Sequence, residues 1–390
     1  MNKMKISTNR ALYIIFVSLS LFFHVFNNIE VTEGVKLFHI FAILAVMYGY
    51  PLVMKRETLQ KNIFLLIGCI LISCMISYYE NSTNLGIGVA IIIMSVMGLK
   101  RTDVHWTLII NNLLSPIVII SLLYLNFTQP SFRFCGYYND PNYLCTTLLV
   151  YLYIIILGFW KFESKIIKAV LATEILAIFV LVSFTLSRTG MFCTALVLIT
   201  TFASFFIKSW KETTILGVVL GAFIIYNMPN ILHEQKDMLE NRIFEANDNV
   251  GHAAAYRREL SQRRVKYVVG HPQMLPFGVG LGALSHNEVL PDFDSHDKHV
   301  DHNTFTGIFT ELGIFSIIFF LLIIKSMISQ IYRQRRLNFG YLRLVTFVAF
   351  ILFSFSVNQI QYLPFWWMLF FLINFSEDEN TAHQLLRSLR

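Results

Sequence analysis

The sequence predicts an all-α protein embedded in a membrane, and two observations support this prediction: the composition and the length of the apolar stretches. Of the 390 residues, 55% are hydrophobic and only 14% are charged, and 36 are phenylalanine. A water-soluble domain of this size carries more charge and fewer apolar side chains. Apolar stretches of roughly 17 to 25 residues, each long enough to cross a hydrocarbon core of ~30 Å, recur along the chain, so we expect about twelve transmembrane helices.

The expected helices form two groups, one before and one after a long polar segment. Residues 1–228 hold helices 1–9, residues 229–303 form an extracytoplasmic loop subdomain, and residues 304–390 hold helices 10–12 and a cytoplasmic tail. The boundaries lie where charged or turn-forming residues interrupt an apolar stretch. The expected spans are residues 11–27, 34–54, 62–79, 84–99, 105–125, 143–159, 166–186, 189–207, 213–228, 304–324, 342–358 and 361–375.

Lysine and arginine in the short connections predict the orientation of the chain. Cytoplasmic connections carry an excess of these residues, and here they gather in every second connection. The alternate connections, such as residues 27–33 and 80–84, contain acids or almost no cations. An even number of spans then places both termini in the cytoplasm. The net charge of +7 reflects this topology, so no nucleic-acid partner is expected. The cationic connections contain Lys55, Arg56, Lys61, Lys100, Arg101, Lys161, Lys165, Lys168, Lys208, Lys211, Arg333, Arg335, Arg336 and Arg343.

Two of the expected outer segments that precede residues 229–303 each place an arginine beside the membrane. Residues 126–142 mix aromatic side chains with Arg133, Asn139 and Asn142, and the next short outer segment contains Arg188. An unpaired arginine at that depth costs roughly 2.5 kcal/mol or more, so we expect Arg188 to have an anionic partner. The alternative is that Arg188 reaches lipid headgroups, or pairs with a carboxylate for packing alone.

The long outer segment contains one expected helix and a glycine patch. Residues 253–269 are basic and lack glycine and proline, which predicts a helix that His271 and Pro272 end. The patch from Gly278 to Gly282 has alternate glycines, but no lysine followed by serine or threonine comes after it, which argues against a phosphate loop. We expect a tight turn or a close backbone approach there instead.

His302 lies where the long segment re-enters the membrane, and it is the expected general base. A neutral imidazole accepts a proton near physiological pH. Guanidinium groups bind phosphate oxygens in a bidentate way and stay charged, so the outer arginines suit a diphosphate attached to a lipid. ATP and nucleotide sugars are absent outside the cytoplasm, so a glycosyl transfer there needs the lipid diphosphate itself as its leaving group. The outer arginines are Arg133, Arg188, Arg257, Arg258, Arg263 and Arg264.

Other interpretations of these residues stay open. A basic helix is also typical of a solvated face or of contact with lipid headgroups. Histidines and aspartates alternate closely from His296 to His302, and three histidines spaced three apart can share one face of a helical turn and bind zinc. Glu174 and Glu311 lie inside expected spans, where a carboxylate is costly and often functional, unless it is protonated or bonded to a neighbouring helix.

Four motifs, in this order, resemble those of the O-antigen ligase and polymerase superfamily of bacterial envelope glycosyltransferases. Each motif is short, and the combination is more specific than any one of them. They cover the chain from Arg133 to Phe315. The motifs are residues 133–136 with 139–142; residues 186–190; Arg257 with His271, Pro272 and the glycine patch; and His302 and Asn303 with residues 311–313.

The resemblance implies a metal-independent inverting glycosyltransferase without a cofactor, located in the bacterial cytoplasmic (inner) membrane with its active site outside the cytoplasm. Its donor is an oligosaccharide linked to a polyprenyl diphosphate, such as undecaprenyl diphosphate. His302 matches the motif histidine that acts as the base, and Arg188 and Arg257 match the arginines that hold the diphosphate. Arg258 is a rival for the place of Arg257. The expected substrate-binding residues are Arg258, Arg133, Asn139, Asn142, Asn303 and Gly280.

The resemblance leaves the acceptor open, because ligase and polymerase share the same donor chemistry. The compact length favours a polymerase of surface polysaccharide, such as O-antigen, capsule or exopolysaccharide. Transfer to the lipid A core of lipopolysaccharide by a ligase is the alternative. Residues 273–276 and the acidic run 292–301 depart from the family pattern on the acceptor side. The expected partners are the lipid-linked donor, a glycan or lipid-linked acceptor, membrane lipids and other proteins of envelope-polysaccharide assembly.

Two functions of other classes were weighed against glycosyl transfer. A transporter or flippase also needs many spans, but such proteins commonly have repeated halves and broken helices at the midplane. Here the polar candidate residues gather on one side, around a large loop, which favours chemistry over translocation. A purely structural scaffold for an envelope-synthesis complex is the third interpretation, and it predicts that substitutions of Arg188 and His302 have no effect on the product.

Overall fold

The computed structural model describes residues 7–32, 35–49, 57–77, 79, 81–129, 131, 133–208, 248–285, 303–333 and 340–374. Within these ranges the all-α prediction holds. The only strands there, β1 (Glu30–Thr32) and β2 (Val35–Lys36), form a short antiparallel hairpin. The helices are α1 (Thr8–Val25), α2 (Leu37–Gly49), α3 (Glu57–Met75), α4 (Ser82–Met97), α5 (Arg101–Thr128), α6 (Pro141–Lys161), α7 (Lys165–Phe184), α8 (Arg188–Lys208), α11 (Asp248–Gly270), the 3₁₀ turn η2 (Ala283–Ser285), α12 (Thr304–Arg333), α13 (Gly340–Phe353) and α14 (Leu363–Asn374).

Apolar helices make this a multi-pass membrane protein. Among the described residues, α1, α5, α6, α7 and α12 are long and apolar enough to cross a membrane, and α2, α3, α4, α8, α13 and α14 are shorter apolar helices. Each of them overlaps one expected span. The remaining expected span, residues 213–228, lies outside the described residues, as do 229–247 and 286–302 of the expected loop subdomain.

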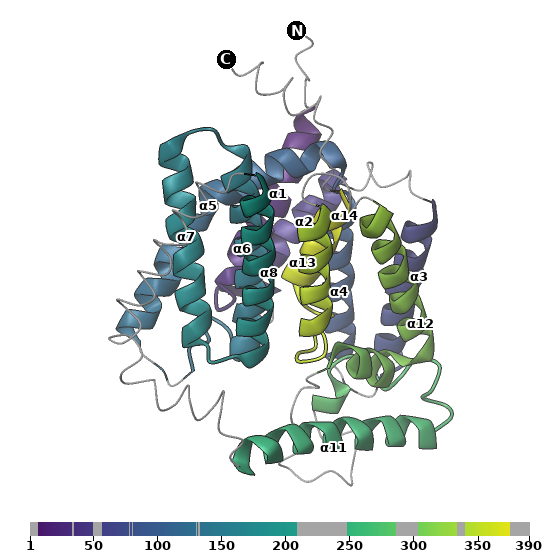
Figure 1. Ribbon diagram of the computed structural model, residues 1–390. Helices are drawn as coiled ribbons and strands as arrows, with labels where there is room; N and C mark the ends of the chain where they lie inside the picture. Colours follow the sequence, from purple (N-terminus) through teal and green to yellow (C-terminus); the bar gives the residue numbers. More distant parts are fainter. Residues whose placement is uncertain are drawn as a thin grey trace.

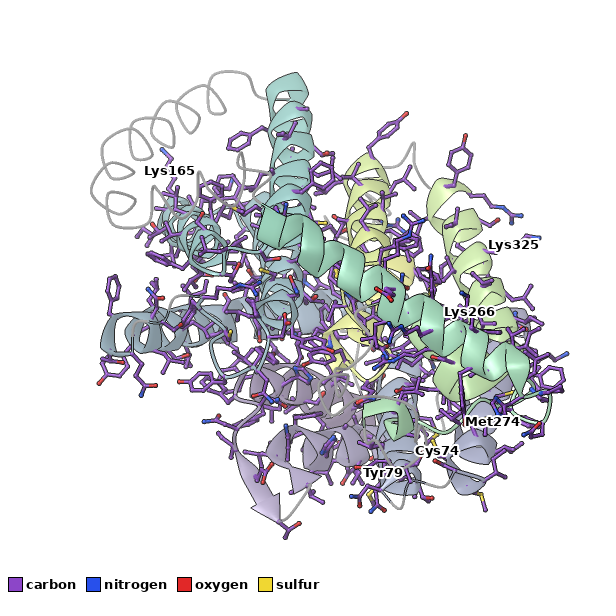
Figure 2. The ribbon with its side chains drawn as sticks, turned by 90° about the horizontal axis from the view of Figure 1, so that it is seen from below. Cys74, Tyr79, Lys165, Lys266, Met274 and Lys325 are labelled. Atoms are coloured by element: carbon purple, nitrogen blue, oxygen red, sulfur yellow. The ribbon has the colours of Figure 1, made fainter. Side chains whose placement is uncertain are left out.

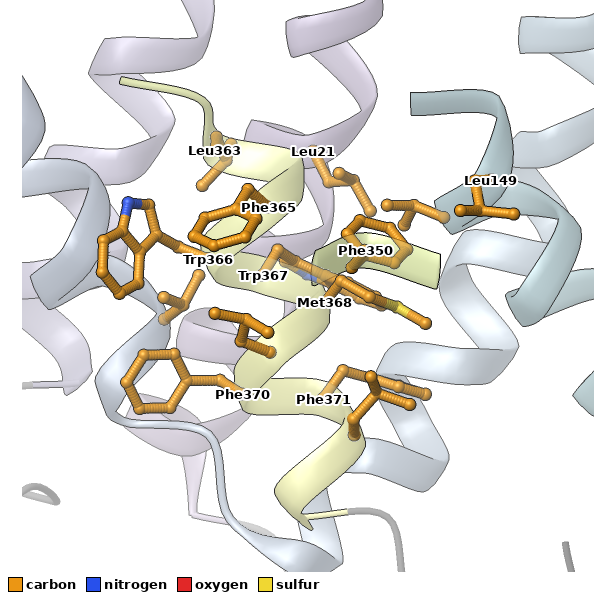
Figure 3. Close-up of a cluster of buried hydrophobic side chains, with 14 of the residues drawn as sticks. Leu21, Leu149, Phe350, Leu363, Phe365, Trp366, Trp367, Met368, Phe370 and Phe371 are labelled. Atoms are coloured by element: carbon orange, nitrogen blue, oxygen red, sulfur yellow. The ribbon is translucent and has the colours of Figure 1, made fainter. Parts of the chain in front are cut away.

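The bundle is arranged around α6 and α14, and α11 lies across one end of it (Figure 1). Every residue of α14 is buried, including the two large indoles of Trp366 and Trp367. Trp367 stacks on Phe371 with ring centroids 4.7 Å apart, and Figure 3 shows these rings within the apolar cluster around α14. Burial on all sides places α14 at the centre of the bundle, since a helix at the edge would leave one face exposed to lipid.

Helix α5 shows how the outer helices divide their faces. Leu113 and Ile120 are strongly exposed on the surface that faces lipid, whereas Thr107, Asn111 and Ser115 are completely buried. The three buried residues recur every four positions and face the bundle interior. Polar side chains join helices inside a membrane because lipid offers them no partner.

Glu174 on α7 is bonded to this polar face of α5. Ser115 Oγ lies 2.7 Å from Glu174 Oε2, and the carboxyl group is buried. The alternative in which Glu174 bonds a neighbouring helix is therefore confirmed.

The end of the bundle away from α11 contains two cations bonded inside the protein, a half-buried one and a buried one. Arg10 at the start of α1 forms an ion pair with Asp103 at the start of α5. Arg343 is buried in α13, and its Nε and Nη2 donate to the carbonyl oxygen of Leu372 near the end of α14, at 3.1 and 2.7 Å. A cation is favourable there because the carbonyl end of a helix carries partial negative charge. The placement of Arg343 in a connection was wrong, because α13 begins at Gly340.

The expected span 342–358 was also too long. Helix α13 ends at Phe353, and residues 354–362 form turns before α14. These turns lie at the same end of the bundle as α11 and the first residues of α12 (Figure 1). The polar residues Ser354, Ser356, Asn358 and Gln359 break the apolar pattern, and the next subsection shows what they bind.

Candidate functional site

The first two family motifs meet through one buried hydrogen bond. Asp140 caps α6 by accepting from the backbone N–H of Asn142 at 2.7 Å, with Pro141 as the first helical residue. Ser187 caps α8 in the same way, because its Oγ accepts from the N–H of Gly190 at 3.0 Å. The Ser187 hydroxyl also donates to Asn142 Oδ1 at 2.6 Å. The two helix starts are therefore held side by side.

The segment between α7 and α8 is strained and tightly packed. Leu186 has φ +51, which is uncommon for a residue with a side chain. A Cβ at Gly190 would lie 2.5 Å from Cys145 Sγ, so the closeness of α6 and α8 requires glycine there. Strain of this kind persists where the surrounding structure holds it, and it is common at functional sites.

Hydrogen bonds continue from these helix starts to the start of α12. Thr146 Oγ1, one turn after Asn142, accepts from Gln359 Nε2 at 3.4 Å. The backbone N–H of Gln359 donates to Thr304 Oγ1 at 2.9 Å, and Thr304 Oγ1 donates to the carbonyl of Val357 at 2.7 Å. Thr304 follows His302 by two residues. The turn at 354–362 thus connects the segment of Asn142 with the first residues of α12.

A second connection runs from the residue next to Arg188. Thr189 Oγ1 and Ser356 Oγ are 2.8 Å apart, and the backbone N–H of Thr304 donates to the carbonyl of Ser354 at 2.7 Å. Arg188 itself is the first residue of α8 and is exposed. The start of α8 and the start of α12 therefore bond residues of the same turn that are only two apart, Ser356 and Ser354.

Three of the predicted arginines, Arg133, Arg188 and Arg258, have side chains without an ion pair among the described residues. Arg188 is exposed, and Arg133 is half-buried with its Nε enclosed and unbonded. Their segments touch, since the N–H of Phe134 donates to the carbonyl of Phe184 at 3.1 Å. Arg133 lies close to Cys135 and Asp140: burial raises the pKa of the Cys135 thiol, Asp140 adds to this rise, and Arg133 opposes it.

The expected basic helix is confirmed as α11, and its arginines point in different directions. The face toward the bundle contains Leu260, Arg264 and Val268 at four-residue spacing, all nearly inaccessible. Arg258 and Arg263 are exposed on the other side. Arg257 precedes Arg264 by seven residues, about two helical turns, so its position falls on the stripe of Leu260 and Arg264 rather than on that of Arg258. Figure 2 shows α11 crossing the end of the bundle, with Lys266 on it and Met274 in the loop that follows.

The glycine patch makes the close backbone approach that the sequence predicts. Helix α12 is broken at Gly313, where φ is 80 and ψ is −179. The loop after α11 fills this break: Val279 and Gly280 donate through their N–H groups to the carbonyls of Thr310 and Glu311, at 3.2 and 2.8 Å. A Cβ on Gly278 would overlap the backbone of residues 311 and 312. The third and fourth family motifs are therefore one structural unit.

Residues 273–276, one of the two stretches that depart from the family pattern, take part in the same unit, whereas the acidic run 292–301 lies outside the described residues. The carbonyl of Leu275 accepts from the N–H of Ile314 at 2.9 Å, and the carbonyl of Pro276 lies 3.4 Å from the N–H of Phe315. Both lie in the inserted stretch 273–276. The insertion thus bonds the second half of the broken helix, while the glycines bond the first half.

The remaining predicted residues are divided between the described chain and the rest. Asn303 caps α12, with its Oδ1 accepting from the N–H groups of Phe305 at 2.9 Å and Thr306 at 3.3 Å. Asn139 is exposed, and Gly280 is buried against Ser77 and Ser82. His302 and the alternative zinc ligands from His296 onward lie outside the described residues, as does the side chain of Arg257. Among the side chains that are described, no cluster of histidine, cysteine and carboxylate could hold a metal.

Sequence reasoning missed the polar residues that join the motifs. Ser187, Thr304 and Gln359 make the bonds between α6, α8 and α12, and none was predicted as a site residue. A usable signal exists for Gln359, because it follows Asn358 in the short polar connection between the expected spans 342–358 and 361–375. Ser187 precedes the first residue of a helix, where serine is a preferred cap.

The fold and these contacts define a class: a helical membrane protein in which polar residues of several short motifs are bonded together at one end of the bundle, where a helix lies across it. Comparison with known families agrees. Residues 173–321 match the family model described as O-antigen ligase. The matched segment includes Arg188, all of α11, the glycine patch and the broken part of α12. No curated protein sequence matches the chain. The family match confirms the resemblance to the O-antigen ligase and polymerase superfamily and supports glycan transfer of the ligase or polymerase type.

Proposed function

We propose that this protein transfers an oligosaccharide from a polyprenyl diphosphate to a sugar hydroxyl on the outer face of the bacterial cytoplasmic membrane. The O-antigen ligase match supports a lipid-linked glycan as the substrate class. Polymerisation of a surface polysaccharide is the favoured activity, and the acceptor is then another lipid-linked repeat unit. Transfer to a lipid A core by a ligase uses the same donor half of the site.

The observation that carries this proposal is the convergence of three helix starts. The bond from Ser187 to Asn142, the bond from Thr189 to Ser356 and the bonds of Thr304 to the 354–359 turn bring the starts of α6, α8 and α12 to one end of the bundle. His302 precedes α12 by two residues and Arg188 is the first residue of α8. The base and the cation of the proposed reaction therefore belong to adjacent segments.

Arg188 occupies a position that favours an anion. The N-terminus of a helix carries partial positive charge, so a cation there is unfavourable unless a negative group binds nearby. Arg188 forms no ion pair with any part of the chain that the structure describes. A diphosphate bound at this point would interact with the guanidinium group and with the helix dipole together. Arg133, close by and also without an ion pair, adds a second cation.

The reaction breaks one bond and forms one. The acceptor hydroxyl oxygen attacks the anomeric carbon of the donor sugar, while the bond from that carbon to the diphosphate oxygen breaks. His302 takes the hydroxyl proton, and the negative charge that develops on the leaving diphosphate is stabilised by Arg188 and Arg257. Attack from the face opposite the leaving group inverts the anomeric configuration. No metal is required, because the arginines neutralise the diphosphate.

The test uses purified protein with a lipid-linked repeat unit, with and without a lipid A core acceptor. A ladder of products without the core supports polymerisation, and a single transfer that needs the core supports a ligase. Turnover that EDTA abolishes and zinc restores would require a metal in place of the proposed base. No transfer to either acceptor by well-folded protein would overturn the proposal.

Three variants examine the residues separately. His302→Ala is expected to reduce transfer by roughly 10²–10⁴-fold, the usual contribution of a positioned base. Arg188→Lys retains the charge but loses bidentate binding, so it is expected to reduce transfer as well. Lys266→Ala removes an exposed charge from α11 and serves as the control with activity near that of the wild type. Normal product length from a well-expressed His302→Ala variant would refute the assigned base.

A further inference from the structure

Aromatic side chains from four separate parts of the chain gather beside the helix starts of the candidate site. Tyr143, which directly follows Asn142, stacks on Tyr362 with ring centroids 3.8 Å apart and an interplanar angle of 4°. Tyr138 lies 6.1 Å from the Tyr362 ring, and the His24 ring lies 5.4 Å from it. The chain thus holds an ordered aromatic group at its outer end.

The tyrosine hydroxyls differ in what they bind. The Tyr138 hydroxyl is buried and bonded to Thr147 Oγ1 at 2.9 Å and to the carbonyl of His24 at 3.0 Å. The Tyr143 hydroxyl donates to the carbonyl of Asn358 at 3.2 Å. The Tyr362 hydroxyl has no hydrogen-bond partner within the described chain, and Tyr362 is half-buried rather than enclosed. Among these tyrosines, Tyr362 therefore has a hydroxyl group that is available for a hydrogen bond.

An amide with an unused acceptor lies next to these rings. Gln359 is completely buried, and its Nε2 donates to Thr146 while its Oε1 has no partner among the described residues. The N–H of Tyr362 donates to the carbonyl of Gln359 at 2.9 Å, so the amide and the ring belong to one tight turn. A buried acceptor without a donor is costly, and a bound hydroxyl group would satisfy it.

We propose that Tyr143, Tyr362 and Gln359 form a subsite for a sugar ring of the acceptor glycan, a proposal that rests on the proposed transfer reaction. A pyranose ring has an apolar C–H face and a rim of hydroxyl groups. Aromatic faces with a few placed polar groups match both features. The C–H face packs on the tyrosine rings. Sugar hydroxyls bond the side-chain oxygen Oε1 of Gln359 and the Tyr362 hydroxyl.

The position of this subsite favours the acceptor rather than the donor. Asn142 lies between the proposed diphosphate site and the aromatic group. Its side chain binds Ser187, the neighbour of Arg188, and the next residue, Tyr143, belongs to the aromatic group. On the other side, Gln359 is bonded to Thr304, close in sequence to the proposed base. A sugar at the tyrosines therefore lies between the segments of the cation and of the base. All three subsite residues fall outside the segment that matches the family model, residues 173–321.

The experiment measures binding of the free repeat-unit oligosaccharide, released from its lipid by mild acid, to purified protein without donor. Ligand-detected NMR titration gives the affinity. Tyr362→Leu is expected to weaken binding roughly tenfold, the order that an aromatic contact supplies, whereas Tyr362→Phe retains most of it. Tyr341→Leu, which replaces an exposed tyrosine of α13, is the matched control and is expected to bind as the wild type.

Kinetics and a second ring separate specific from structural effects. Tyr362→Leu and Tyr143→Leu are expected to raise the acceptor KM and leave the donor KM unchanged. Equal loss in Tyr362→Leu and Tyr341→Leu, or displacement of the oligosaccharide by polyprenyl phosphate without sugar, would overturn the subsite. Oligosaccharide binding without transfer from any lipid diphosphate would instead refute the transfer reaction and leave the sugar site standing.

Discussion

Gly278→Ala tests whether the glycine patch holds the broken helix together. The residue has φ +70, and an added Cβ would overlap backbone atoms of Glu311 and Leu312, which cannot rotate away. An L-residue in this left-handed region costs about 1–2 kcal/mol. Lifting the loop to relieve the overlap also breaks the two backbone hydrogen bonds that Val279 and Gly280 make to α12, each worth about 0.5–1.5 kcal/mol.

The expected loss of local stability is therefore about 2–5 kcal/mol. At about 1.4 kcal/mol per factor of ten, this loss speeds opening of the loop by roughly 30-fold to a few thousand-fold. Hydrogen–deuterium exchange with mass spectrometry, on protein in lipid nanodiscs, reads this opening from peptides that cover residues 274–284. Transfer activity, measured in parallel, should decrease, because the loop connects α11 to α12.

Gly270→Ala is the matched control, since it makes the same chemical change in the same outer segment. An added Cβ at Gly270 meets nothing within 4 Å, and its backbone is not left-handed. Exchange in that variant should stay as in the wild type. Unchanged exchange in Gly278→Ala, or an equal effect of both substitutions, would refute the steric reasoning.

Three further outcomes are expected. Arg343→Met removes a buried guanidinium from the carbonyl of Leu372 and should lower the free energy of unfolding by about 1.5–3 kcal/mol, measured as a lower thermal midpoint in detergent. Arg333→Met, at the exposed end of α12, is the control and should leave the midpoint unchanged. Equal midpoints for the two variants would contradict the stabilising role of Arg343. Because the Asn303 side chain caps α12, Asn303→Ser should retain activity and Asn303→Ala should lower stability by about 1 kcal/mol. Loss of substrate binding in a stable Asn303→Ser variant would instead assign Asn303 to the substrate. Burial raises the pKa of Cys135, so labelling by a membrane-impermeant maleimide from outside should increase only at a pH above the usual thiol pKa of about 8.5. Labelling from the cytoplasmic side alone would mean that the predicted orientation is reversed.

The sequence was sufficient for features that depend on local composition. The apolar stretches predict the helices because a backbone in lipid has to satisfy its own hydrogen bonds, and α11 ends before His271 and Pro272 because proline cannot continue a helix. The alternation of glycines predicts a close approach, since only glycine accepts the left-handed φ values found at Gly278 and Gly280. None of these inferences needs a distant residue.

The roles of individual polar residues depended on partners far along the chain. Asn142 was predicted to bind substrate, and the fold adds that its side chain accepts from Ser187, 45 residues further along the chain. Arg258 and Arg264 look alike in the sequence, but the packing of α11 on the bundle exposes one and buries the other. A polar side chain has several possible partners, and local sequence does not rank them.

By itself, the sequence determined that this is an all-α membrane protein with a basic helix in a long polar segment and with motifs of the O-antigen ligase and polymerase superfamily, because helix length, apolarity and turn residues act over a few neighbouring positions. Only the tertiary structure decided that Gln359 joins Thr146 to Thr304, and that a loop fills the break at Gly313. Those contacts join segments separated by tens to hundreds of residues, and they form where burial leaves each polar group one available partner.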